Sequence, residues 1–156
     1  MLRLILMPII AGFIATIGIT AVLWAIDKTG WTNADMVRAI GSFFTKSYDN
    51  ALRIGLLIHF VSGMAIAAVY LHILSISGSP DLESVILMGG VIGLGQGFIV
   101  GYGIVKFADI HPVAAFQEAD YQVAIAHIIG HVVYGMLIGL LFGVFRLMGY
   151  DVSPGF

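Results

Sequence analysis

Two histidines open matching apolar phrases in this chain. The first phrase is HFVSGMAIAAVY at residues 59–70, and the second is HVVYGMLIGLLF at residues 131–142. Five of their twelve positions are identical, including the leading His. Ionisable side chains are costly inside a membrane, and those that occur there usually mark a functional site. We therefore take His59 and His131 as the first candidate cofactor-binding residues.

The sequence leaves three kinds of chemistry open for these imidazoles. His59 and His131 could be the two axial ligands of a haem b held between helices. His127 lies one helical turn before His131, a spacing at which two histidines chelate copper or another transition metal, and His59 could complete that metal site. In the third case the histidines only form hydrogen bonds between helices, with Gln96, Thr16 or each other, and so fix their packing.

A haem would need cations for its propionates and space for its macrocycle. Arg38, Lys46 and Arg53 lie on the same side of the predicted membrane segments as the histidines and could pair with the propionates. Glycines beside the histidines would leave room for the ring, although closely packed glycine rows would exclude it.

The composition places these histidines in a membrane protein. The chain is 60% hydrophobic and 10% charged, with a mean hydropathy of +1.03, whereas about a quarter of the residues of a soluble domain are charged. Four stretches are long enough to cross a hydrocarbon core about 30 Å thick, at residues 3–26, 51–75, 84–107 and 121–148. We predict an all-α integral membrane protein, a four-helix transmembrane bundle that forms a single domain over residues 1–156.

The matching phrases predict that the bundle is built from two duplicated helical hairpins. A second pair of phrases, GFIATIGI at 12–19 and GFIVGYGI at 97–104, is identical at five of eight positions and keeps the same order. Repeat A covers residues 3–76 and repeat B residues 84–148. Such parallel repeats are related by an axis along the membrane normal, so His59 and His131 are expected to face each other at similar depth.

Residues 27–50, the long first connection that makes repeat A longer than repeat B, predict a short amphipathic helix between the first two spans. Met36, Ile40 and Phe43 recur at helical spacing, and Thr32 followed three residues later by Asp35 resembles a capping box. We expect this helix to lie in the membrane interface.

Glycines at four-residue spacing predict which faces of the spans meet, because small residues let helix backbones approach closely. The histidines lie in the same rows, so we expect them to point into the bundle. The nine predicted packing residues are Gly55, Gly63, Gly89, Gly93, Gly97, Gly101, Gly135, Gly139 and Gly143.

Several functional classes lack their usual signatures. The sequence has no phosphate-binding loop, HExxH motif or Gly-x-Ser-x-Gly elbow, so we expect no catalytic activity of its own. A net charge of −2 without a basic run excludes nucleic acid as a partner. No carboxylate lies deep in a predicted span, which argues against an ion-coupled transporter.

We therefore predict a small accessory or structural subunit of a larger bioenergetic or oxidoreductase complex in a prokaryotic cytoplasmic membrane. Its partners would be the lipid bilayer and other membrane subunits, and its inward histidine pair would bind a cofactor. The first alternative is a b-type haem or copper protein that transfers electrons itself. The second is a small-solute channel or transporter, which the glycine-rich third span leaves open.

Overall fold

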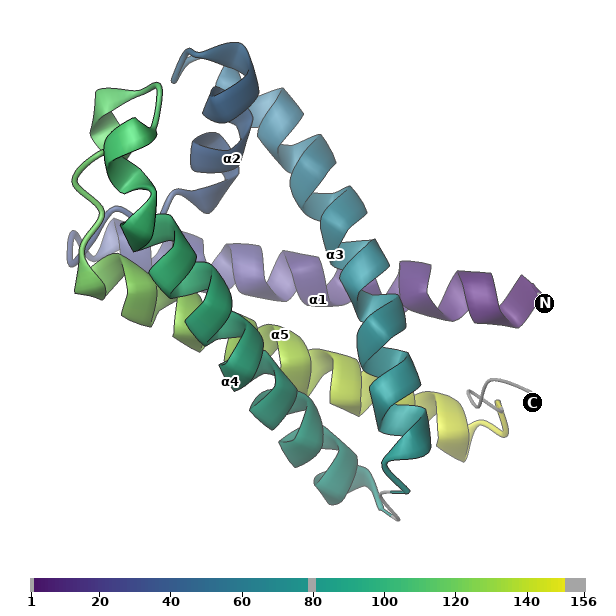
Figure 1. Ribbon diagram of the computed structural model, residues 1–156. Helices are drawn as coiled ribbons and strands as arrows, with labels where there is room; N and C mark the ends of the chain where they lie inside the picture. Colours follow the sequence, from purple (N-terminus) through teal and green to yellow (C-terminus); the bar gives the residue numbers. More distant parts are fainter. Residues whose placement is uncertain (1, 79–80, 151–156) are drawn as a thin grey trace.

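The computed structural model describes residues 2–78 and 81–150, and these residues are helical almost throughout (Figure 1). The elements are α1 (Leu2–Lys28), α2 (Met36–Thr45), α3 (Ala51–Ile76), α4 (Leu82–Lys106), the 3-10 turns η1 (Ala108–Ile110) and η2 (Ala114–Phe116), and α5 (Tyr121–Leu147). Four of the helices are long and apolar enough to cross a membrane, which confirms the predicted all-α class and the four spans. Residues 1, 79–80 and 151–156 of the predicted single domain lie outside the described residues.

Acidic caps begin two of the spans where the apolar runs start. The Asp81 carboxylate accepts a hydrogen bond from the Ser84 amide at 2.8 Å, and Asp120 accepts one from the Gln122 amide at 2.9 Å. Each bond satisfies an amide that the first helical turn leaves without a partner. The hydrogen bonds from Ser84 also hold the pKa of Asp81 below its usual value.

The spans pack unequally. Helices α4 and α5 lie antiparallel and in contact along most of their length, whereas α1 crosses α3 and also packs on α5 (Figure 1). Contact between α3 and α4 is sparse. The chain therefore contains one tight helix pair, α4–α5, with α1 and α3 arranged more openly beside it.

Glycines account for the tight pair. A Cβ atom added at Gly89 or Gly93 would collide with the backbone of α5 at Gly135 or His131, and one added at Gly139 would collide with the backbone of α4 at Val85. Gly97 and Gly101 of α4 and Gly143 of α5 also lie in this interface, and Gly63 of α3 receives the side chain of Thr16 from α1. All nine predicted packing glycines are buried. Gly55 contacts Val37 of α2 rather than another span.

The two halves do not pack in the same register. In the first half, Gly12 of α1 lies against Gly63 and Met64 of α3. The matching residue in the second half, Gly97, lies against Ile128 and His131 of α5, about one to two helical turns before the positions that correspond to Gly63 and Met64. Duplicated hairpins therefore remain a prediction from the repeated phrases, since the packing shows no matching repeat.

Helix α2 lies in the predicted insert but starts one turn after the expected cap. Asp35, rather than Thr32, is the N-cap and accepts a hydrogen bond from the Arg38 amide at 3.1 Å. Gly41 of α2 packs against the backbone of α3 at Ala51, while Phe43 is half exposed. The position of α2 in a membrane interface remains a prediction.

Replacing Gly93 with alanine should weaken the α4–α5 pair, because the new methyl group meets backbone that cannot move aside. We expect Gly93→Ala to lower the free energy of unfolding by about 1–3 kcal/mol, the usual cost of overpacking. The measurement is denaturation of the purified protein in detergent, followed by circular dichroism. Gly95→Ala is the matched control, since a Cβ at Gly95 of the same helix meets nothing within 4 Å. Equal effects of the two substitutions would contradict this account of the interface.

Candidate functional site

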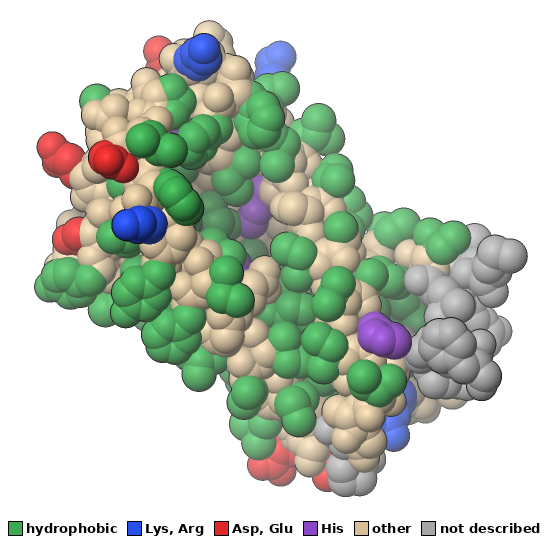
Figure 2. All heavy atoms as spheres, in the orientation of Figure 1, with side chains coloured by type: hydrophobic (Ala, Val, Ile, Leu, Met, Phe, Trp, Pro, Cys, Tyr) green, Lys and Arg blue, Asp and Glu red, His purple; other side chains and the backbone are tan. Residues whose placement is uncertain are grey.

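Two adjoining cavities lie beneath α2. The outer cleft, of about 550 Å³, is bounded by α2, α4, the α4–α5 connection and the start of α5, and its walls include Ile40, Phe43, Ile99, Phe107, Phe116 and His127. The inner chamber, of about 150 Å³, lies among the four spans and is lined by polar residues that include Thr16, His59, Ser62, Gln96, His131 and Tyr134. Met36, Ile40 and Val100 line both cavities. Figure 2 shows histidine side chains in the hollow between α2, α3 and α4.

His127 of α5 is buried at the cleft with one ring nitrogen unused. Its Nδ1 lies 2.8 Å from the carbonyl oxygen of Val123, and because a carbonyl only accepts hydrogen bonds, Nδ1 carries the proton. In the neutral ring Nε2 is then a lone-pair acceptor, and it is buried without a hydrogen-bond partner. The residue is 2% exposed. A buried acceptor without a donor is costly to a fold. Among the described residues, Thr16 Oγ1 and Arg38 Nε are also buried without a partner, and of these three atoms only Nε2 of His127 belongs to a residue that lines the outer cleft.

His131, one turn further along α5, is held in the same way. Its Nδ1 donates to the carbonyl oxygen of His127 at 2.8 Å, and the ring lines the inner chamber. The glycines of α4 help to fix this residue, because Gly93 and Gly97 lie directly against it. The two α5 histidines thus lie one above the other, one at the outer cleft and the other at the inner chamber.

His59 of α3 also lines the inner chamber but is bound to α1. Its Nε2 lies 3.1 Å from Oγ1 of Thr20. Because the Thr20 hydroxyl donates to the carbonyl oxygen of Thr16 at 2.6 Å, the hydroxyl oxygen accepts from Nε2–H of His59. Neither Gln96 nor Thr16, the partners considered from the sequence, hydrogen-bonds to a histidine. Gln96 instead accepts from the Tyr70 hydroxyl at 2.6 Å.

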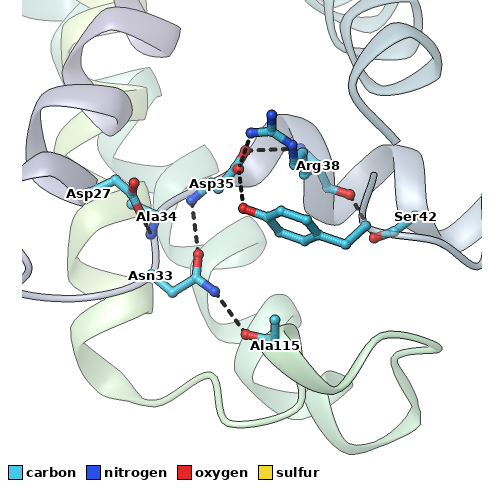
Figure 3. Close-up of polar contacts among 8 residues, drawn as sticks. Asp27, Asn33, Ala34, Asp35, Arg38, Ser42 and Ala115 are labelled. Carbon is cyan, nitrogen blue, oxygen red and sulfur yellow. Dashed lines mark hydrogen bonds and ion pairs between the residues drawn. The ribbon is translucent and has the colours of Figure 1, made fainter. Parts of the chain in front are cut away.

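A hydrogen-bond network holds α2 above the cavities (Figure 3). Asp27 at the end of α1 accepts from the Ala34 amide at 3.2 Å, and Asn33 donates to the carbonyl oxygen of Ala115 in the α4–α5 connection at 2.8 Å. Arg38 and Asp35 form an ion pair at 2.8 Å, and this hydrogen bond raises the pKa of Arg38. The bonds of Ala34 and Asn33 join the start of α2 to the end of α1 and to the α4–α5 connection.

His111 is a structural histidine in the α4–α5 connection. Its Nε2–H donates to the carbonyl oxygen of Ala39 in α2 at 3.0 Å, and its Nδ1 accepts from the Val113 amide at 3.1 Å. The ring packs edge-on against Phe43 and Phe116, with centroids 4.4 and 5.0 Å apart. Both nitrogens are occupied, so His111 positions the connection and leaves no lone pair for a ligand.

A haem between His59 and His131 does not fit the helices as they stand. The inner chamber of about 150 Å³ is below the roughly 300 Å³ of small ligand pockets, and Nε2 of His59 is already bonded to Thr20. The expected cations are also absent from the larger cavity. Among the described residues that line the outer cleft there is no Lys or Arg, whereas Asp35, Glu118 and Asp120 line it.

The predicted metal set is assembled only in part. His127 and His131 share one face of α5, and each donates its Nδ1 proton to a carbonyl, an arrangement typical of metal-binding histidines. Within residues 2–78 and 81–150, however, no three His, Asp or Glu side chains come close enough to hold a metal ion. His59 therefore does not complete a three-histidine site.

The chain matches no protein-family model, and no curated protein or solved structure shows significant similarity to it. The case for a function therefore depends on the geometry of the two cavities.

Three further polar residues of the site were missed or misjudged from the sequence. Thr20 fixes the His59 ring, and Tyr134 of α5 donates to the carbonyl oxygen of Gly63 at 2.6 Å. Tyr70 packs edge-on against Tyr134, with ring centroids 5.5 Å apart. The sequence did contain a signal for the two tyrosines, because both belong to the matching phrases. Tyr70 lies eleven residues after His59, and Tyr134 lies three residues after His131.

The unused nitrogen of His127 predicts an unusual stability effect. Replacing His127 with phenylalanine keeps an aromatic ring and removes a buried acceptor whose missing partner costs about 1–3 kcal/mol. We therefore expect ligand-free His127→Phe to unfold at the same temperature as the wild type or a higher one. His59→Phe is the comparison and should lower the melting temperature, because it removes the hydrogen bond to Thr20. A larger loss in His127→Phe than in His59→Phe would show that His127 serves packing.

Proposed function

We propose that this chain is a membrane-embedded binding subunit that holds a lipid-soluble cofactor or substrate in the outer cleft. The observation that carries the proposal is Nε2 of His127, a buried acceptor without a partner at a mainly apolar cleft. Native folds rarely leave such a group unpaired. A cleft of about 550 Å³ lies within the range of about 300–1,000 Å³ that is typical of small-molecule sites.

The rim of the cleft favours a ligand that arrives through the membrane. Three large apolar residues border it and are also exposed at the surface: Phe43 of α2 by 48%, Ile99 of α4 by 78% and Phe107 beside α4 by 58%. Helix α2 packs on α3 and makes little or no contact with α4. These exposed apolar residues favour entry of a lipid-soluble molecule from the membrane.

The cavities favour binding over conduction. Tyr134 lines the inner chamber, and beyond it Ile138, one turn further along α5, and Leu74, about two turns beyond Ile66 of α3, are fully buried in the core. Val85 of α4 is fully buried there as well. A channel would need its polar path to continue at this depth, so the geometry supports a ligand site with one entrance better than a channel or transporter.

The exposed surface of the spans supports the subunit part of the proposal. Only 33–44% of the residues in the most apolar window of each span are buried within this chain. The remaining apolar faces are available to lipid and to neighbouring helices, including the face of α4 that carries Phe98 and Tyr102. A membrane complex of bioenergetic or oxidoreductase type is the setting that we propose for such a subunit.

Blocking the cleft tests the binding proposal. Gly103 of α4 lines the cleft, and a Cβ atom there meets nothing within 4 Å, so Gly103→Leu should fill the cleft without disturbing the fold. The wild type and the variant are purified in mild detergent, and the bound small molecules are identified by mass spectrometry and absorption spectroscopy. We expect a compound that copurifies with the wild type and is lost from Gly103→Leu. Gly95→Leu, on the same helix but away from the cleft, should retain it. A wild type without any bound compound, or equal amounts in all three proteins, would contradict the proposal.

Migration in native gels tests the subunit proposal. We expect the chain, solubilised from native membranes in mild detergent, to migrate with other membrane proteins in a complex of defined size. Because the partner helices would cover apolar faces, separation from them should lower the melting temperature of the chain. A free chain with unchanged thermal stability would contradict a role as a subunit.

A further inference from the structure

We infer that the ligand of the outer cleft is a hydroquinone-type lipid, a ring with hydroxyl groups at both ends and an apolar tail. This inference rests on the proposed function and adds the chemical class of the ligand. Three properties of the cleft support this inference: the hydrogen-bonding role of His127, the carboxylates in its lining and the aromatic residues of its walls.

The inner end of the cleft selects a hydrogen-bond donor. Nδ1–H of His127 is committed to the carbonyl oxygen of Val123, so Nε2 can only accept in the neutral ring. A hydroxyl group supplies the missing donor. The carbonyl oxygen of an oxidised quinone, or the oxygen of an ether, would place a second acceptor against Nε2 and leave both without a partner.

The carboxylates that line the cleft favour the same kind of ligand. Glu118 lines the cleft together with Asp35, which is paired with Arg38, and Asp120, which caps α5. No Lys or Arg lines the cleft within the described part of the chain. Carboxylates accept hydrogen bonds and repel anions, so they favour a second hydroxyl group over a phosphate or a fatty carboxylate. A cationic ligand would lose its hydration in the mainly apolar cleft, and this loss makes its binding unfavourable.

The walls of the cleft suit a flat ring. Phe43, His111 and Phe116 form a cluster of edge-to-face contacts along one wall, with neighbouring centroids 4.4 and 5.0 Å apart. Phe107 lines the cleft from the end of α4. Aromatic walls of this kind pack a flat ring by stacked or edge contacts, and the exposed apolar residues Phe43, Ile99 and Phe107 at the cleft suit an alkyl or prenyl tail.

Three probes of almost equal shape test the inference. They are a decyl-substituted hydroquinone, the corresponding quinone and the di-O-methyl ether of the hydroquinone. Binding to the full chain in lipid nanodiscs is measured under anaerobic conditions, with the partitioning into empty nanodiscs subtracted. We expect the hydroquinone to bind about tenfold to a hundredfold more tightly than the quinone and the ether, the range that corresponds to one buried acceptor left unpaired.

Two variants assign any preference to its residue. His127→Phe should reduce the preference for the hydroquinone to less than about threefold, because the acceptor is gone. His72→Phe makes the same change at an exposed position of α3 away from the cleft, and it should retain the full preference. Melting temperatures of both variants confirm that they are folded.

The outcomes separate this inference from the proposed function. If all three probes bind equally to the wild type and their binding is lost in Gly103→Leu, the hydroquinone inference is overturned and the lipid-soluble ligand site remains. If none of the probes binds while a different compound copurifies with the wild type, the hydroquinone inference is again overturned and the proposed ligand site remains. A preference for the hydroquinone that persists in His127→Phe would also overturn the inference. Loss of the preference in His127→Phe alone supports it.

Discussion

The close approach of the α4 and α5 backbones is the constraint on which the rest of the structure depends. Glycines replace side chains along this interface, so that Gly89 meets Gly135 and Gly93 meets His131 without intervening atoms. Such contact fixes both the rotation and the axial position of α5 relative to α4. His127 and His131 of α5 then line the two cavities, His127 the outer cleft beneath α2 and His131 the inner chamber that α3 also lines. A looser pair would give these histidines no defined direction.

The polar groups of the interior fall into two sets with different meanings. Both ring nitrogens of His111 are hydrogen-bonded, to Ala39 and Val113, and Nε2 of His59 is bonded to Thr20, so these two histidines join elements distant in the sequence. His127 has only an internal bond to its own helix and keeps one nitrogen free. A histidine that is hydrogen-bonded between helices stabilises a membrane fold modestly, whereas a buried ring nitrogen without a hydrogen-bond partner lowers the stability of the fold. Retention of the second kind is best explained by a bound partner, because packing alone would favour an apolar ring.

The sequence was sufficient to predict the helices and the faces on which the glycines lie, but it could not predict the hydrogen-bond partners. Span length and glycine spacing are local properties, and they predicted α1, α3, α4 and α5 closely. The crossing of α1 and α3 depends on how far each helix slides along its neighbour, and Gly12 and Gly97 show that matching sequences slide differently. His59 and His131 line the same inner chamber, as expected, but Nε2 of His59 is bonded to Thr20, a partner that the sequence did not predict. Whether Nε2 of His127 has a hydrogen-bond partner likewise depends on how the helices are placed relative to one another.

The unequal halves explain why the cleft exists at all. In the matching phrases, the position of His127 in the second half corresponds to Gly55 in the first. Gly55 has no side chain, and the backbone of α2 at Val37 occupies that space. The same helix then extends over the gap beside α4, where His127 lies at the cleft. A histidine at position 55 would displace α2, and a glycine at position 127 would leave the cleft without its acceptor. The long connection between α1 and α3 therefore supplies the covering helix, Gly55 leaves space for its backbone, and His127 lies at the cleft in the second half.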